Sequence, residues 1–191
     1  GRHAEFKIKR LNRRAAAANS WIDIPRWNQC GGVVDLEALR TVPCFAALGL
    51  ASTKDMTALR LVWRVDEKWV TWGRYWVPRD AVAQRTERGT VPYAAWVGSG
   101  NVVQTDGDVT DYRVIEDDIL ALRERFNIVG IAYDAWNASD LVNRLVEHEL
   151  PMVQCIHGTK SYHPAMQELE RAYTSGALNH GDDPVLRWNA A

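Results

Sequence analysis

The chain has 191 residues, of which 47% are hydrophobic and 25% are charged. This ordinary globular composition suits one domain with a modest appendage, and it excludes disordered, collagenous and disulfide-scaffold proteins. No apolar run approaches the roughly 18 residues of a membrane span, and no signal-peptide pattern opens the chain. The formal net charge of −1 excludes a protein that is basic throughout, so any nucleic-acid site must be local.

The cysteines are three in number and form no CxxC pair. We expect Cys30, Cys44 and Cys155 to be free thiols in a reducing cytoplasm.

The first 14 residues carry six basic side chains against one acid, Glu5. Alanines follow, and because neither Gly nor Pro interrupts residues 2–18, this segment is predicted to be helical. Such a charge run is usually a solvated face, and contact with DNA is the alternative. The stretch "NSWIDIPRWNQCGG" reads as a connector, with Trp21 and Trp27 as its anchors. We therefore divide the chain into a basic helix and linker at 1–32 and a domain at 33–191.

Three consecutive strands are predicted at the start of this domain. The apolar run at 44–51 does not alternate, which is typical of a central strand covered on both faces. Residues 57–65 do alternate, and Arg60 and Arg64 mark a face open to water. A turn at 66–68 leads to the third strand, at 69–77, and we expect the three to be antiparallel.

The second half of the domain alternates between helices and strands. Residues 78–112 are predicted to be irregular apart from a short helix near 79–87, because prolines and glycines interrupt them. The elements that follow are a helix facing inward at 115–126, a strand at 128–134, an amphipathic helix around 141–146, a strand at 152–156, and a last helix opened by Ser161 and Pro164 with Met166, Leu169 and Tyr173 facing inward. The final "GDDPVLRWNAA" carries no predicted element. The order indicates an α/β domain with a mixed sheet flanked by helices.

Asp134 is the strongest candidate for a functional side chain. A carboxylate that ends an apolar strand is costly unless something compensates its charge, and a divalent metal is one such compensation. The alternative is that Asp134 caps the following turn or helix. Asp55 has the same two interpretations, because it follows the strand at 44–51 in the loop "STKD". The sequence contains no P-loop, HExxH or GxSxG motif, and its five histidines are scattered.

Several separated motifs resemble the nuclease domain of large terminase subunits of tailed phages. "CFAALGLASTKDMTALRLVW" is similar to that family's opening strand and loop, close to "GLDLASTxDLTAL". The later motifs follow in the same order: "YWVPRDAVAQR", "VPYAAWVGSGNVVQTDGDVTDY", "GIAYDAWNASDLVNRL" and "MQELERAYTSGALNHGDDPVLRWNAA". The resemblance covers residues 33–191, and "EFKIKRLNR" and "SWIDIPRWNQC" are similar to the segment that joins the packaging ATPase to the nuclease.

The resemblance implies an RNase H-like fold and endonuclease cutting of concatemeric double-stranded DNA in the cytoplasm of an infected bacterial host. It implies two divalent ions, Mg²⁺ or Mn²⁺, held by a cluster of acids for phosphodiester hydrolysis. The implied partners are DNA, an upstream packaging ATPase domain, the small terminase subunit and the portal, with no membrane.

Carried over residue by residue, the resemblance gives an incomplete metal site. The family's first metal-binding Asp falls on Gly49, which offers no ligand. Asp55 matches the second acid of that loop, and Asp134 matches the acid that ends the later strand. The family's last acid lies beyond "PVLRWNAA", and Asp182 and Asp183 do not match it. Either an Asp-to-Gly change has inactivated a longer protein, or the chain comes from a diverged packaging gene.

Two alternatives remain beside the terminase nuclease. Gly49 favours a catalytically silent DNA-binding or motor-docking module of the same fold. An unrelated RNase H-like enzyme, such as a resolvase or transposase fragment, is the second alternative, against which the "YWVPRD" and "PVLRW" motifs argue.

Overall fold

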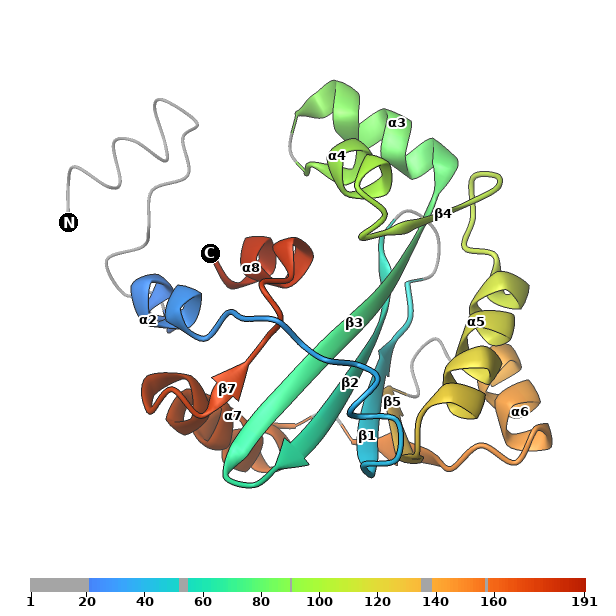
Figure 1. The fold of residues 1–191 in the computed structure, drawn as a ribbon. Coiled ribbons are helices and arrows are strands. Elements are labelled where there is room, and N and C mark those ends of the chain that lie inside the picture. Colours follow the sequence, from blue (N-terminus) through green and yellow to red (C-terminus); the bar gives the residue numbers. More distant parts are fainter. Residues whose placement is uncertain (1–20, 52–54, 90, 135–138, 157) are drawn as a thin grey trace.

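The computed structural model describes residues 21–51, 55–89, 91–134, 139–156 and 158–191. Its centre is a seven-stranded mixed sheet with the order β4-β3-β2-β1-β5-β6, in which the short β7 pairs with β3 (Figure 1). The strands are β1 (Cys44–Gly49), β2 (Thr57–Val65), β3 (Lys68–Pro78), β4 (Val103–Thr105), β5 (Ile128–Asp134), β6 (Met152–Cys155) and β7 (Leu178–Asn179). The prediction of an α/β domain with a mixed sheet flanked by helices is confirmed, and no helix within the described ranges is long and apolar enough to cross a membrane.

The three antiparallel strands form as the sequence predicted. β1 pairs antiparallel with β2, and β2 pairs antiparallel with β3 along its whole length. Asp66, in the turn between β2 and β3, has a φ of 52°, a left-handed conformation that a short polar side chain tolerates better than most. Leu59, Leu61 and Trp63 alternate along β2 and are fully buried.

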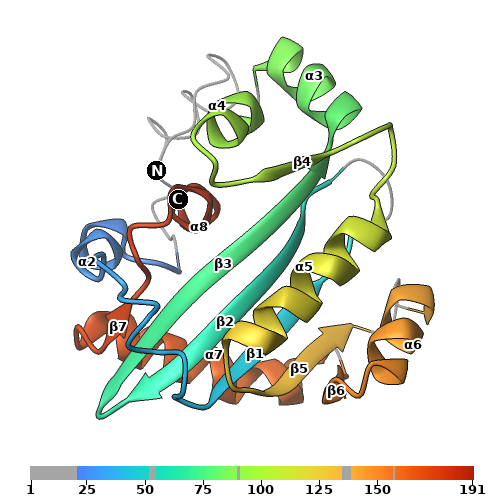
Figure 2. The same cartoon turned by 45° about the vertical axis from the view of Figure 1, so that its right-hand side comes forward.

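The parallel half of the sheet places β5 between β1 and β6. Helix α5 (Tyr112–Arg125) precedes β5 in the chain, α6 (Ser139–Glu147) connects β5 to β6, and both helices lie on one side of the sheet. Figure 2 shows α5 lying along that side, in front of β1. Ile115 and Ile119 of α5 are fully buried in the core, as their helical spacing predicted.

The opposite face of β1, β5 and β6 is open in the described part of the chain. Burial alternates strictly along β1, and Phe45 is 66% exposed. Val153 of β6 is 55% exposed and pairs in register with Ala132 of β5, which in turn pairs with Ala47 of β1. The prediction that the strand at 44–51 is covered on both faces is therefore wrong. The strand is central in the sheet, but the described helices cover only one of its faces.

A second cluster anchors the connector to the domain. Helix α2 (Ile24–Gln29) begins at the cap Asp23 and packs Trp27 against α7 (Thr159–Thr174). The Trp27 ring lies edge-on to Tyr173 and stacks on His180 at 5.0 Å, and the His180 Nε2 lies 2.8 Å from the Trp27 carbonyl oxygen. Trp27 anchors the connector as predicted, whereas Trp21 is 43% exposed.

The N-terminal helix predicted at 1–18 lies outside the described residues. The division of the chain at residue 33 stays a prediction.

Helix α7 differs from the predicted last helix. It begins at Thr159, before Ser161, and contains Pro164 inside it. Tyr173 faces inward as predicted, but Met166 is 44% exposed. A further helix, α8 (Pro184–Ala190), follows where no element was predicted, capped by Asp183, which accepts hydrogen bonds from the backbone N–H groups of Val185 and Leu186.

The region from 78 to 112 is more ordered than predicted. The short helix predicted near 79–87 is α3 (Arg79–Arg88), which ends at Gly89 with a φ of 62°. Helix α4 (Tyr93–Gly98) and strand β4 were not predicted. Val102 and Trp96 are buried with α3 and α4 in a cluster of their own, so local packing orders residues that the glycines and prolines marked as irregular.

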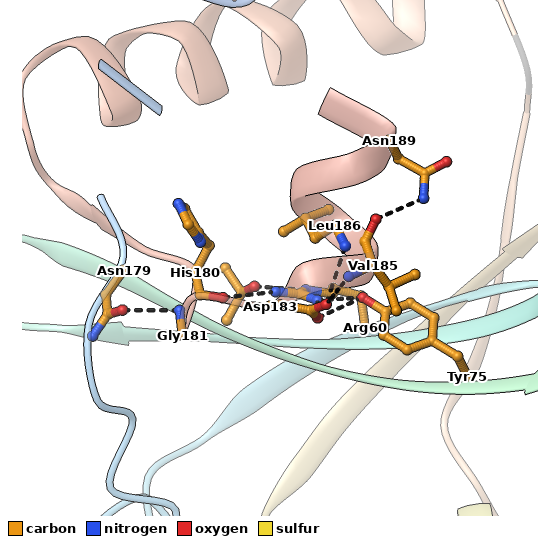
Figure 3. A network of polar contacts seen from close by, with 10 residues as sticks. Arg60, Tyr75, Asn179, His180, Gly181, Asp183, Val185, Leu186 and Asn189 are labelled. Atoms are coloured by element: carbon orange, nitrogen blue, oxygen red, sulfur yellow. Dashed lines mark hydrogen bonds and ion pairs between the residues drawn. The ribbon is translucent and has the colours of Figure 1, made fainter. Parts of the chain in front are cut away.

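Arg60 lies in a polar network rather than on a face open to water (Figure 3). Its guanidinium donates to Thr71 Oγ1, Tyr75 Oη and Asp183 Oδ2. The side chains of Arg60 and Asp183 are only 17% and 13% exposed. The expectation of a wet face holds for Arg64, which is exposed, and is wrong for Arg60, because the start of α8 covers that part of β2.

Candidate metal centre

The candidate site forms where the parallel strands β1 and β5 end. Leu48 lies opposite Tyr133 in their register, so Gly49 and Asp134, the next residues of each strand, reach the same edge of the sheet. A cavity of about 630 Å³ lies here, lined by Ala47, Leu48, Gly49, Leu50, Ala51, Asp55, Met56, Ala58, Ala132, Tyr133, Asp134, Cys155 and Tyr162. The two acids predicted from the sequence, Asp55 and Asp134, therefore line one cavity.

Asp134 is held by the end of β5. It pairs in register with Cys155 at the end of β6, and both line the cavity with Tyr162 of α7. Partial burial raises the pKa of the Tyr162 phenol above its usual value, and charges on Cys155 and Asp134 raise it further. These three side chains are thus electrostatic neighbours at the same edge of the sheet.

Asp55 lies on the opposite rim, just before β2, and it is paired with an arginine. Arg85 of α3 donates from Nη2 to Asp55 Oδ1 at 2.7 Å. The side chain of Asp55 is 73% exposed and that of Arg85 35%, so the pair is open to solvent. The carboxylate is accessible from the cavity, and a cation that binds it has to compete with Arg85.

Gly49 leaves room for the missing side chain. A Cβ atom built on this residue meets only the Ala58 carbonyl oxygen, at 4.0 Å, which is an ordinary contact distance. The position lines the cavity with the two acids. A Cβ atom at position 49 would therefore displace no described neighbour, and the residue that carries it lines the same cavity as Asp55 and Asp134.

The donor set fits one hard divalent ion and is too small for two. Mg²⁺ is commonly held by one or two carboxylates together with waters and substrate phosphates. Asp55 and Asp134 can supply the carboxylates. Within the described ranges, no group of three or more His, Cys, Asp or Glu side chains is placed to hold a metal.

Sequence reasoning missed three residues of this site. The prediction that Cys155 is a free thiol is confirmed. Its position beside Asp134 depends on the β5–β6 register, which the sequence does not give. Tyr162 enters through the packing of α7. Arg85 is 30 residues from its partner Asp55, and no sequence spacing pairs a helix with a distant loop.

The sequence matches the family "Terminase large subunit, endonuclease domain" over residues 2–191. It is 28% identical over 184 residues to the large terminase subunit of Enterobacteria phage HK97, a match that covers 95% of this chain and 36% of that protein. It is 31% identical over 193 residues to Protein YmfN of Escherichia coli strain K12, covering 96% of this chain and 42% of that protein. The chain therefore spans well under half the length of these curated relatives.

Solved structures show the same fold. The crystal structure of the HK97 large terminase superimposes with a TM-score of 0.81 at 27% identity, covering 100% of this chain and 40% of that one. The large terminase nuclease of thermophilic phage G20c superimposes with a TM-score of 0.50 at 7% identity, covering 81% of this chain and 76% of that one, which supports the fold alone. The expectation of an RNase H-like fold is confirmed. With a mixed sheet of this topology and a family match over nearly its whole length, the chain belongs to the endonuclease-domain family of terminase large subunits.

Proposed function

We propose that this chain is the nuclease part of a phage DNA-packaging terminase whose metal centre is incomplete. The observation that carries the proposal is the shared cavity of Asp55, Asp134 and Gly49 at the edge of β1 and β5 in a chain of this family. In the intact centre, acids at positions 49, 55 and 134 would hold Mg²⁺ or Mn²⁺ beside a phosphodiester of double-stranded DNA.

The chain's own residues determine how the reaction would be arranged. When bound, divalent ions supply an activated water and stabilise the leaving oxygen of an in-line displacement. Asp134 is fixed by strand pairing and holds its carboxylate at one side of the cavity. Asp55 contributes from a loop on the other side, and β1 ends between them at Gly49. Without a carboxylate at 49 the two acids hold one ion weakly, which favours Mn²⁺ at millimolar concentration.

The biological setting follows from the family. The substrate would be concatemeric DNA, cut in the cytoplasm of an infected bacterial host. An upstream packaging ATPase domain, the small terminase subunit and the portal would be its partners. The match to little more than a third of the HK97 large subunit supports a role as one part of such a protein.

Plasmid cleavage with Mg²⁺, Mn²⁺ or EDTA tests this proposal. We expect negligible cutting by the chain as it stands, because one carboxylate is replaced by Gly49. We expect metal-dependent, largely sequence-independent nicking and cutting when Asp is restored at 49 together with a C-terminal segment that carries the family's last acid. Robust cutting by the present chain would show that position 49 is not a ligand position.

A second candidate function is a DNA-binding or motor-docking module without catalysis. Gly49 favours it, because this glycine leaves two acids in the cavity. The same assay separates the two functions: if the restored protein also fails to cut while binding DNA, the non-catalytic function is favoured.

A further inference from the structure

Within the described part of the chain, the charged residues that line the cavity of the candidate metal centre are acids. Among the described residues that line it, two are aspartates and none is a lysine or arginine. A DNA backbone that enters this cavity meets like charge, so a bound cation or a nearby arginine is needed to accept its phosphates. Arg85 contacts one lining acid, Asp55, at the rim of the cavity.

The position of Arg85 is set by the packing of its helix against a neighbouring helix. It projects from α3, which packs against α4, and the buried Tyr93 of α4 lies beside the ion pair. Burial is the main cause that raises the pKa of the Tyr93 phenol, while the charge of Asp55 raises it and that of Arg85 lowers it. Both charged groups are therefore close to one ordered side chain.

Among the described residues, the pair with Asp55 occupies only part of the guanidinium of Arg85. A guanidinium has five N–H donors in a planar fork that matches two phosphate oxygens, and the bond to Asp55 uses one nitrogen, Nη2. Because both partners are substantially exposed, the pair is weak and easily exchanged. A divalent ion on Asp55 and a phosphate on Arg85 would satisfy both groups at once.

We propose that Arg85 binds a DNA phosphate at the candidate metal centre, and that Asp55 holds it in the DNA-free protein and releases it when Asp55 takes a divalent cation. The inference rests on the proposed function, in which this cavity accepts metal and DNA. Binding of Mn²⁺ and of DNA should then be positively coupled, and by the same factor in both directions.

The DNA arm of the test measures binding of a fluorescein-labelled 20-base-pair duplex by anisotropy, with Mn²⁺ present at a fixed concentration, over a range of salt concentrations. Arg85→Gln should lower the slope of log affinity against log salt by about 0.9, the value for one phosphate contact. Arg79→Gln is the matched control, because Arg79 lies on the same helix and pairs with the exposed Asp106 at 3.0 Å. Arg85→Lys should keep the slope but bind more weakly, because it keeps the charge and loses the fork. If the wild type and Arg85→Gln had the same slope, the assignment of a phosphate to Arg85 would be overturned. The same would follow if Arg79→Gln lowered the slope as much as Arg85→Gln does.

The coupling arm compares affinities with and without Mn²⁺, with the duplex checked for intactness afterwards. Mn²⁺ should tighten duplex binding by the wild type about 1.5- to 5-fold more than binding by Arg85→Gln, the range expected for releasing an exposed ion pair. Without Mn²⁺, Asp55→Asn should bind the duplex more tightly than the wild type does, whereas Asp106→Asn should not. Equal tightening in the wild type and Arg85→Gln would overturn the release by Asp55.

The metal arm uses no DNA and separates this inference from the proposed function. Electron paramagnetic resonance of free Mn²⁺ should show about 1.5- to 5-fold tighter binding by Arg85→Gln, because Asp55 loses its competitor. Asp55→Asn and Asp134→Asn should weaken binding. If neither aspartate variant changes Mn²⁺ binding, the metal centre is wrong and the coupling fails with it. If both variants weaken binding while Arg85→Gln changes nothing, the proposed function stands and the release of Arg85 is wrong.

Discussion

Leu48 and Tyr133 are register partners in the parallel pair of β1 and β5, and this pairing places Gly49 beside Asp134 at the edge of the sheet. Two carboxylates fixed on adjacent strands at this edge would form a rigid donor pair, and the glycine removes one of them. Changes at this pair of positions are therefore the most direct tests of the site.

Replacing Gly49 by Asp should fold normally and bind metal more tightly. The position has room for a side chain, with the nearest neighbour of a Cβ atom at 4.0 Å. We expect Mn²⁺ to raise the melting temperature of Gly49→Asp clearly more than that of the wild type, because ligand binding to the folded state adds stability by mass action. Gly49→Asn is the control of equal size without charge. Equal Mn²⁺-dependent shifts in both variants would show that position 49 does not face the ion.

Removing Asp134 from the restored nuclease should abolish cleavage with little change in folding. In the protein with Asp at 49 and the C-terminal acid supplied, Asp134→Ala should reduce plasmid cutting to the EDTA background. Its urea midpoint should stay close to that of the parent, since Asp134 is only half-buried at a strand end. Glu124→Ala, on the exposed surface of α5, is the control that keeps activity. Cutting without Asp134 would refute its role as a metal ligand.

The ion pair of Arg60 and Asp183 should be a major contributor to stability. Asp183 also caps α8 and accepts a hydrogen bond from Tyr75 at 2.6 Å. Asp183→Ala should lower the free energy of unfolding by about 3 kcal/mol, because it leaves a mostly buried arginine without its partner. Asp106→Ala, in the exposed pair with Arg79, should cost less than about 1 kcal/mol. Urea denaturation measures the free energy of unfolding of both variants. Similar losses would show that burial does not strengthen the ion pair of Arg60 and Asp183.

The free energy of unfolding should fall in alkaline solution because the Cys44 thiol loses its proton there. Burial raises the pKa of this thiol from 9.0 to about 11. The unfolded chain therefore loses the thiol proton at a lower pH than the folded chain. The contribution of the protonated Cys44 thiol to the free energy of unfolding is complete below pH 9 and is lost as the pH rises through 11. The difference corresponds to about 3 kcal/mol.

Urea denaturation of the wild type and Cys44→Val between pH 8 and 11 measures this contribution. Cys44→Val should lack this part of the decline, while the titration of Tyr75, whose pKa burial also raises, remains in both proteins. Parallel curves for the two proteins would contradict the prediction.

Most of the strands were readable from the sequence, and the covering of the strands was not. Alternation along β2 and the apolar runs of β1 and β5 mark strands because the side-chain period of two is a local property. Whether a second layer covers a strand depends on distant segments. Phe45 is exposed because no described helix covers it. Arg60 is mostly buried because Asp183, the cap of α8, pairs with it from 123 residues later in the chain.

The residues of the candidate site also fall into two groups, those that the sequence predicted and those that only the packing of distant elements places. Asp134 was predictable because a carboxylate at the end of an apolar strand is unusual, and Asp55 and Gly49 followed from the family resemblance. The pairing of Asp55 with Arg85 and the approach of Tyr162 arise from packing of α3 and α7 around the sheet, which no local pattern encodes.

The anchoring of α2 by Trp27 has a mechanical consequence. Residues 22–30 are fixed to the domain through the Trp27 contacts with Tyr173 and His180 and through the Cys30 thiol, which donates to the Tyr173 carbonyl oxygen. None of these residues lines the cavity at the ends of β1 and β5. A pull on the chain before Ile22 is therefore borne first by α7 and by the segment that leads into α8, and α7 also carries Tyr162, which lines that cavity.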